Sequence, residues 1–179
     1  MNKDRKIAII VGALILIAYA VLANSITDSK IIVMFFEVIS GLAVIGIAAF
    51  MFPFFKSYDK KITFLYAIGK YIEGLLMVVA GIFFLLPFTS TLFGARDPIY
   101  LIHTYIFILS AALFYYLFYK SELVPRWISV WGFIAVISLL IGNLLEIFYT
   151  SPLLKLFYLL IILNEIFLAI WLMVKGFKK

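Results

Sequence analysis

Six ionisable side chains stand inside stretches that otherwise consist of Leu, Ile, Val, Phe and Tyr. They are Glu37, Lys70, Glu73, His103, Glu146 and Glu165. A charged group at the centre of a bilayer costs about 3 kcal/mol or more on insertion scales, so such residues face a protein interior or a hydrated cavity and pair with other polar groups. Carboxylates, an ammonium group and an imidazole at that depth can bind a cation, carry protons or hold a metal ion.

The composition predicts that these residues lie in a membrane protein. Of 179 residues, 66% are hydrophobic, 18% are aromatic and only 13% are charged, whereas a soluble domain is about 45–50% apolar and about 25% charged. We therefore predict an all-α polytopic membrane protein, because every backbone group must be hydrogen-bonded within the chain in lipid. The absence of cysteine excludes disulfides, iron–sulfur clusters and thiolate metal sites.

Six apolar segments long enough to cross a bilayer are separated by short polar connections. About 17–25 apolar residues are needed for one helical span. The predicted spans are residues 7–23, 31–55, 62–88, 98–119, 127–148 and 152–177. Because all the connections are short, we expect residues 1–179 to form a single six-helix bundle without a soluble domain.

Basic residues outside the spans predict the orientation of this bundle. One set of connections and ends holds Lys3, Arg5, Lys6, Lys56, Lys60, Lys61, Lys120, Arg126, Lys175, Lys178 and Lys179, whereas the other set holds Lys30, Arg96 and Lys155. Cytoplasmic loops are enriched in Lys and Arg, so we predict a multi-pass protein of the cytoplasmic membrane with both termini inside. The net charge of +6 comes from these clusters, so the expected partner is the lipid bilayer and not nucleic acid.

Helix geometry divides the ionisable residues into two layers. With a rise of 1.5 Å per residue, Glu37, His103 and Glu146 lie within about 10 Å of the extracellular ends of their spans. Glu73 and Glu165 lie about 20 Å deep, and Lys70 lies one turn below them. Glu37 shares a helix face with Ser40 and Gly41, and Glu73 shares one with Gly81, which is typical of helix–helix contact faces. We therefore expect the acids to point into the bundle.

Four interpretations of this polar set remain open. The first is an acidic, partly hydrated cavity that binds a cation or a small amphipathic ligand and serves sensing, resistance or regulation of a membrane partner, without enzymatic activity. The second is a membrane-embedded metal-dependent enzyme that uses Glu37, His103 and Glu146 as metal ligands. No HExxH motif or second histidine supports it, and the residues imply no particular cofactor.

The third interpretation is a proton-coupled small transporter that uses Glu73, Glu165 and Lys70. Six spans make a small transporter, so it would require a homodimer. The fourth is purely structural, with the polar groups forming interhelical hydrogen bonds that fix the packing.

Two segments resemble a known family. They are Lys-Ser-Glu-Leu-Val-Pro-Arg-Trp-Ile-Ser-Val-Trp-Gly, residues 120–132, and Ala-Ile-Trp-Leu-Met-Val-Lys-Gly-Phe, residues 169–177. Together they resemble the bacterial and archaeal integral-membrane family catalogued as domain of unknown function 4386. Further similarities are Glu37, Glu73 with a basic residue three positions before it, and Glu165.

The chain departs from that family at two positions. Lys70 stands where the family usually has arginine, and Asn164 stands where it commonly has glutamine. Lysine cannot make the bidentate fork of arginine. The resemblance implies a six-helix inner-membrane protein of a prokaryote and no particular activity, and it favours Glu37, Glu73 and Glu165 over Glu146 and His103 as site residues. Asn164 is a further candidate for ligand or ion binding.

Overall fold

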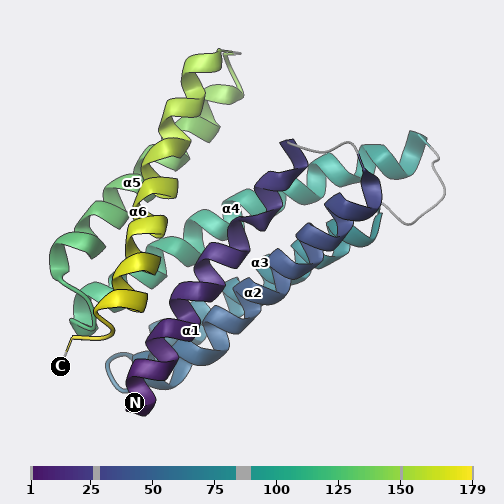
Figure 1. Cartoon of the computed structure of the whole chain (residues 1–179). Helices are drawn as coiled ribbons and strands as arrows, with labels where there is room; N and C mark the ends of the chain where they lie inside the picture. The colour runs from purple at the N-terminus through teal and green to yellow at the C-terminus, as the bar shows by residue number, and fades with distance from the viewer. Residues whose placement is uncertain (1, 26–28, 84–89, 150, 179) are drawn as a thin grey trace.

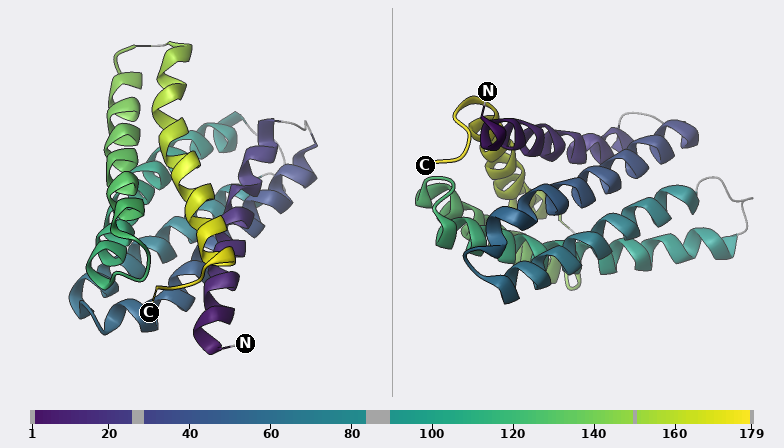
Figure 2. Two further views of the ribbon diagram at one scale, coloured as in Figure 1. Left: turned by 60° about the vertical axis from the view of Figure 1, so that its left-hand side comes forward. Right: turned by 90° about the horizontal axis from the view of Figure 1, so that it is seen from below.

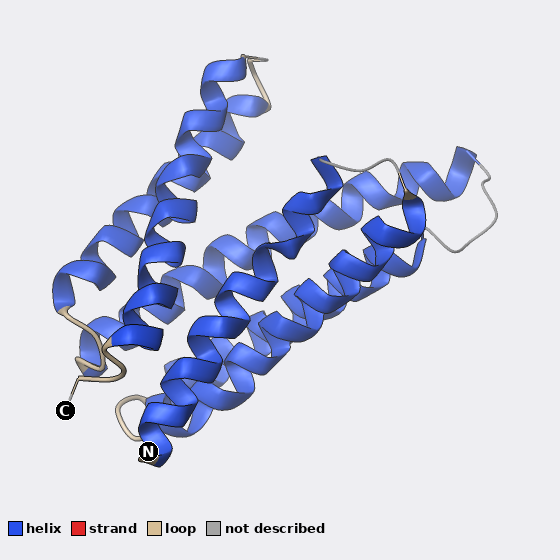
Figure 3. Ribbon diagram, viewed as in Figure 1, coloured by secondary structure: helices blue, strands red, loops and turns tan. Residues whose placement is uncertain are grey.

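Helices account for every regular element in the part of the chain that the structure describes (Figure 3). The computed structural model describes residues 2–25, 29–83, 90–149 and 151–178. The helices are α1 (Lys3–Ala18), α2 (Lys30–Lys56), α3 (Lys60–Ile82), α4 (Ser90–Ser121), α5 (Arg126–Glu146) and α6 (Lys155–Val174). Short 3₁₀ segments, Tyr19–Ser25 and Pro152–Leu154, follow α1 and precede α6. The all-α prediction is confirmed.

Six of these helices are long and apolar enough to cross a membrane, as the sequence predicted. The membrane-spanning stretches are Lys3–Leu22, Lys30–Lys56, Lys60–Ile82, Pro98–Ser121, Arg126–Glu146 and Pro152–Val174. The end of the third predicted span, residues 84–88, lies outside the described residues. The last span is shorter than predicted because α6 ends at Val174, where the chain turns through Gly176 with φ +77°. Helix α4 begins before Pro98 and continues through it, since proline removes one main-chain hydrogen bond without always ending a helix.

The helices close into a ring. Each helix packs against its neighbours in the sequence, and α6 packs back against α1. Figures 1 and 2 show that α1–α4 run side by side, while the α5–α6 hairpin leans away from them. The two groups meet at the end of the bundle that holds both termini, and they separate toward the opposite end. The ring is therefore closely packed at one end and splayed at the other.

Polar contacts tie the terminal end together. The Arg5 guanidinium donates to the carbonyls of Met173 and Val174 at 2.9 and 2.7 Å, where the last turn of a helix leaves carbonyls without helical partners. Asp59 caps α3 by accepting the Ile62 N–H at 3.1 Å, and it pairs with Lys120 at 2.7 Å. The Lys120 hydrogen bond, followed by the Ile62 bond, holds the pKa of Asp59 below its usual value.

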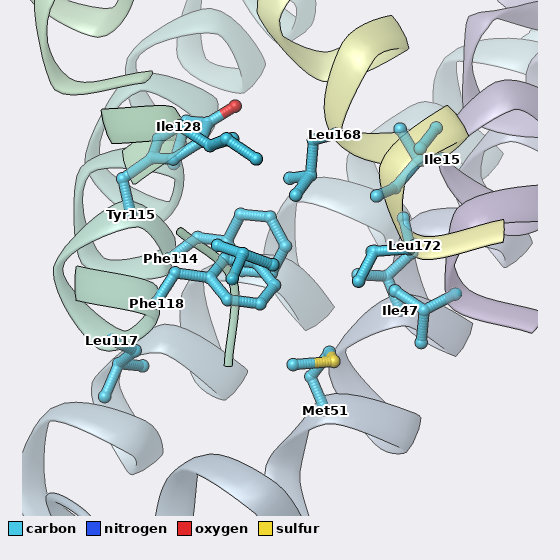
Figure 4. Close-up of a cluster of buried hydrophobic side chains, with 14 of the residues drawn as sticks. Ile15, Ile47, Met51, Phe114, Tyr115, Leu117, Phe118, Ile128, Leu168 and Leu172 are labelled. Atoms are coloured by element: carbon cyan, nitrogen blue, oxygen red, sulfur yellow. The ribbon is translucent and has the colours of Figure 1, made fainter. Parts of the chain in front are cut away.

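The apolar core fills the region where the hairpin joins the other helices. Figure 4 shows side chains of this cluster, with labelled residues on α1, α2, α4, α5 and α6. Phe55 makes edge contacts with the rings of Tyr66 and Phe118, with centroids 5.6 and 5.1 Å apart, and Tyr66 stacks on Phe114 at 5.5 Å. Aromatic pairs of this kind contribute beyond the area that they bury. These ring contacts join α2, α3 and α4.

Two glycines let α2 and α3 approach closely. A Cβ atom at Gly41 would lie 2.5 Å from the Gly74 carbonyl oxygen, and one at Gly74 would lie 2.6 Å from the Gly41 carbonyl oxygen. The sequence predicted that small residues mark contact faces, and the residues that share the Glu37 face, Ser40 and Gly41, are buried. Gly46, one turn further along α2, would meet only the flexible end of Leu14.

We expect Gly41→Ala to destabilise the protein by about 1–3 kcal/mol, because the added methyl group forces two backbones apart. Gly46→Ala is the matched control on the same helix. Its Cβ meets a movable side chain, and alanine has the better helix propensity. The measurement is the thermal unfolding midpoint of both variants in the same detergent. Equal midpoints for the two variants would contradict the close contact between α2 and α3.

Candidate binding cavity

A cavity of about 290 Å³ lies inside the ring. All six helices and the 3₁₀ segment after α1 supply side chains to its wall. Most of these side chains are aliphatic or aromatic. The polar ones are Tyr19, Lys70, Glu73, His103, Thr104, Tyr158 and Glu165. Predominantly apolar walls with a few convergent polar groups are typical of sites for small ligands.

Glu73 is the most tightly held acid of the cavity. Its Oε1 atom pairs with Lys70 Nζ at 3.0 Å, and its Oε2 atom lies 2.5 Å from the hydroxyl of Ser110 on α4. Lys70 and Glu73 are 5% and 1% exposed, so lipid does not reach this pair. The Lys70 ammonium also lies 5.0 Å from the centre of the Phe107 ring, a favourable cation–π distance. The pair is therefore neutralised locally within one turn of α3.

Glu165 faces the same cavity from α6 with a different partner. Its Oε2 atom accepts a hydrogen bond from the Tyr19 hydroxyl at 2.9 Å. Among the described residues Glu165 forms no salt bridge. Because Lys70 balances Glu73, an ionised Glu165 would leave the cavity with one surplus negative charge when His103 is neutral. Such a surplus attracts cations.

Buried polar atoms without protein partners surround the two acids. Within the described ranges, the hydroxyls of Tyr66 and Tyr115 and Nε2 of His103 are buried and accept or donate no hydrogen bond. The Tyr66 hydroxyl is close enough to Glu73 and Glu165 to interact electrostatically with both. Buried polar groups of this kind normally bind ordered water or a ligand. Of these three groups only His103 lines the cavity itself, so its Nε2 atom is available to a hydrogen-bonding ligand there.

The structure brings together only part of the predicted site. One cavity is lined by Lys70, Glu73, His103 and Glu165. His103 therefore lies with the residues of the predicted central layer, and not in the outer layer to which its depth assigned it. The other three predicted site residues do not line this cavity. Glu37 is buried on α2 opposite Gly81. Glu146 is exposed, and its carboxylate accepts a hydrogen bond from the Tyr158 hydroxyl at 2.7 Å. Asn164 is buried, and its side-chain amide donates to the Ile128 carbonyl at 3.2 Å.

The predicted three-residue metal site is not formed. In the part of the chain that the structure describes, no three His, Asp or Glu side chains are close enough to hold one metal ion. Glu37, His103 and Glu146 are therefore not brought together as a ligand group in the described part of the structure. The physical reason is that similar depth does not imply a shared face: Glu146 is exposed at the end of α5, whereas Glu37 is buried between α2 and α3.

Sequence analysis missed two residues that hold the acids in place. Ser110 follows His103 by seven residues on α4, and this spacing of two turns places both on one helix face. That spacing could have indicated from the sequence that Ser110 lies on the same face of the helix as His103. Tyr19 resembled the tyrosines that anchor span ends at the membrane surface, and only the packing of α6 against α1 brings it to Glu165.

Six apolar helices closed around a charged cavity define a multi-pass helical membrane protein. A model of the family described as domain of unknown function (DUF4386) matches residues 88–176, and through this half of the chain the protein belongs to that family. The matched region contains the first of the two segments and all but the last residue of the second, whereas Glu37, Lys70 and Glu73 lie before it. No curated protein and no solved structure matches the chain.

We expect Lys70→Met to destabilise the protein by about 3–5 kcal/mol, because it leaves the buried Glu73 carboxylate without its counter-charge. The double variant Lys70→Met/Glu73→Gln removes both charges and should recover most of the loss. Thermal unfolding of the two variants and the wild type in one detergent tests this. A single variant as stable as the wild type would mean that the pair contributes nothing to folding.

Proposed function

We propose that this protein binds a small organic cation with an apolar body in its intramembrane cavity, in a sensing, resistance or regulatory role. The observation that carries the proposal is the placement of Glu165, with a hydroxyl as its hydrogen-bond partner, on a mainly apolar cavity that also holds the self-balanced Lys70–Glu73 pair. An ionised Glu165 would attract a positive head group, and the apolar wall favours the rest of the ligand.

The aromatic residues of the cavity support a cation as the ligand. Tyr19, Phe107, Phe114 and Tyr158 all line the wall, and aromatic faces attract quaternary ammonium groups. The volume of about 290 Å³ corresponds to roughly ten water molecules. A ligand of the size of benzyltrimethylammonium therefore suits the space.

A proton-coupled transporter remains the second candidate function. Glu73, Glu165 and Lys70, the residues that it would use, all line the one cavity. Transport would require access from both sides of the membrane, so a liposome flux assay with Glu73→Gln separates it from binding alone.

We expect benzyltrimethylammonium to bind the protein in lipid nanodiscs, and Glu165→Gln to weaken binding at least about tenfold, which is about 1.4 kcal/mol. Isothermal titration calorimetry measures the affinity, with empty nanodiscs as the baseline. Glu122→Gln is the matched control, since Glu122 is an exposed carboxylate that pairs with Arg126 at 2.7 Å. Neopentylbenzene, the neutral isostere, should compete poorly.

Two results would overturn the proposal: no saturable binding of the cation, or equal affinity for the cation and its neutral isostere. Equal weakening by Glu165→Gln and Glu122→Gln would also contradict it, because the effect would then be one of overall charge.

We further propose that both termini face the cytoplasm and that the splayed end of the ring faces outward. The support is the excess of Lys and Arg at the terminal end, where Lys56, Lys60 and Arg126 stand at helix ends. Lys and Arg are enriched in cytoplasmic loops. The chain lacks cysteine, so single cysteines report sidedness directly. Ser57→Cys should react with an impermeant maleimide only in inside-out vesicles, and Ser151→Cys only in intact cells. The reverse pattern would contradict the orientation.

A further inference from the structure

In the part of the chain that the structure describes, one polar side chain of the cavity wall has a buried atom without a partner. Four of the others form the two pairs already described, acid with ammonium and acid with phenol. The Thr104 hydroxyl donates to the Tyr100 carbonyl at 2.9 Å, and the Tyr158 hydroxyl donates to Glu146 at 2.7 Å. The remaining side chain is His103, whose Nε2 atom is buried and has no hydrogen-bond partner.

The position of His103 makes it a recognition group. Its imidazole stands in the cavity wall, and the Tyr100 ring one turn earlier meets it edge-on, with centroids 6.1 Å apart. A buried polar nitrogen without a partner is unfavourable, so such atoms normally bind a water molecule or a ligand. The terminal torsion of histidine is broad, so the ring can turn its nitrogen toward a group held in the cavity. A simple tetraalkylammonium ion would leave this nitrogen unused.

We propose that the cavity selects organic cations that also carry a hydroxyl group, with His103 Nε2 bonded to the hydroxyl and Glu165 facing the cationic head. The inference rests on the proposed function, because it names the class of ligand for the same cavity. Both groups face the same polar region, since the Lys70–Glu73 pair interacts electrostatically with His103 and with Glu165. His103 is therefore assigned as a specificity-determining residue.

A hydroxyl group fits this position better than other substituents do. In a neutral imidazole Nε2 donates in one tautomer and accepts in the other, and a hydroxyl can do both. An alkyl group in its place leaves Nε2 unpaired. A carboxylate would cancel the ligand charge that Glu165 attracts. Amino alcohols with a quaternary or protonated nitrogen combine the two required features.

The test compares matched cations in which a hydroxyl replaces a methyl group. The first pair is benzyl(2-hydroxyethyl)dimethylammonium and benzyl(propyl)dimethylammonium, and the second pair has one more methylene in the same arm, so that the reach of the hydroxyl does not decide the result. Calorimetry in lipid nanodiscs measures all four affinities. We expect the wild type to prefer the hydroxyl cation of at least one pair by about three- to tenfold, the range of a single neutral hydrogen bond.

The ratio of affinities is the readout, because a structural role of His103 would weaken both cations of a pair equally. His103→Phe should reverse the preference, since a hydroxyl without a partner is unfavourable in an apolar cavity. His103→Gln keeps a donor and an acceptor and should retain the preference. Thr104→Val is the matched control for the ratio, because Thr104 also lines the cavity but its hydroxyl is bonded within its own helix.

A second measurement needs no variant. His103 is the only histidine of the chain, so protein labelled with ¹⁵N-histidine and purified without a histidine tag gives the imidazole signals of this one ring. We expect the preferred hydroxyl cation to shift the Nε2 resonance and its alkyl partner to leave it nearly unchanged. This measurement decides the question if His103→Phe fails to fold.

The outcomes separate this inference from the proposed function. If none of the four cations binds, the proposed function and the inference fall together. Equal affinities within both pairs in the wild type overturn the inference alone, and so does a hydroxyl preference that persists in His103→Phe. Equal shifts of the Nε2 resonance with the two cations of each pair would also contradict it, because the hydroxyl would then bond elsewhere.

Discussion

An ion pair inside the membrane-spanning part of a protein is stable only where protein or water, and not lipid, surrounds it. Lys70 and Glu73 form such a pair at 3.0 Å on a single turn of α3. One turn of one helix cannot shield them, so the neighbouring helices must enclose the pair. Helix α4 supplies Ser110 and the Phe107 ring, and α6 returns to α1 to close the ring on the far side. The closure of six helices follows from the need to bury these charges.

The helices are held together at one end of the ring and separate at the other. Contacts at the terminal end, such as Arg5 with the last turn of α6 and Asp59 with Lys120, hold the helices together. Toward the opposite end the α5–α6 hairpin separates from α1–α4 (Figure 1). The aromatic core that contains Phe55 and Phe114 lies where the hairpin joins the other helices, and Phe114 also forms part of the cavity wall. The polar cavity therefore lies directly against the packed apolar core.

The candidate site was predicted in part, and the successes and failures have different physical causes. Lys70 and Glu73 are three residues apart on one helix, so helix geometry alone predicts that they meet. Glu165 and His103 were recognised because an isolated ionisable residue in an apolar span is costly anywhere but in an interior. Glu37, His103 and Glu146 were grouped by depth, but the described structure does not bring them together, because depth along a helix carries no information about its rotation in the bundle. Ser110 and Tyr19 were missed because their roles depend on partners from other helices.

The sequence by itself determined the class of the protein, the number of its spans and the inward orientation of Glu37, Glu73 and Glu165, whereas Glu146, also expected to point inward, is exposed. These follow from hydropathy, helix rise and the cost of placing charge in lipid, which are all local quantities. Only the tertiary structure decided that Glu73 and Glu165 share one cavity while Glu146 and Asn164 do not. That outcome depends on which helix packs against which and at what rotation. Close approaches such as Gly41 on Gly74 determine this rotation, and a pattern read along one helix does not contain it.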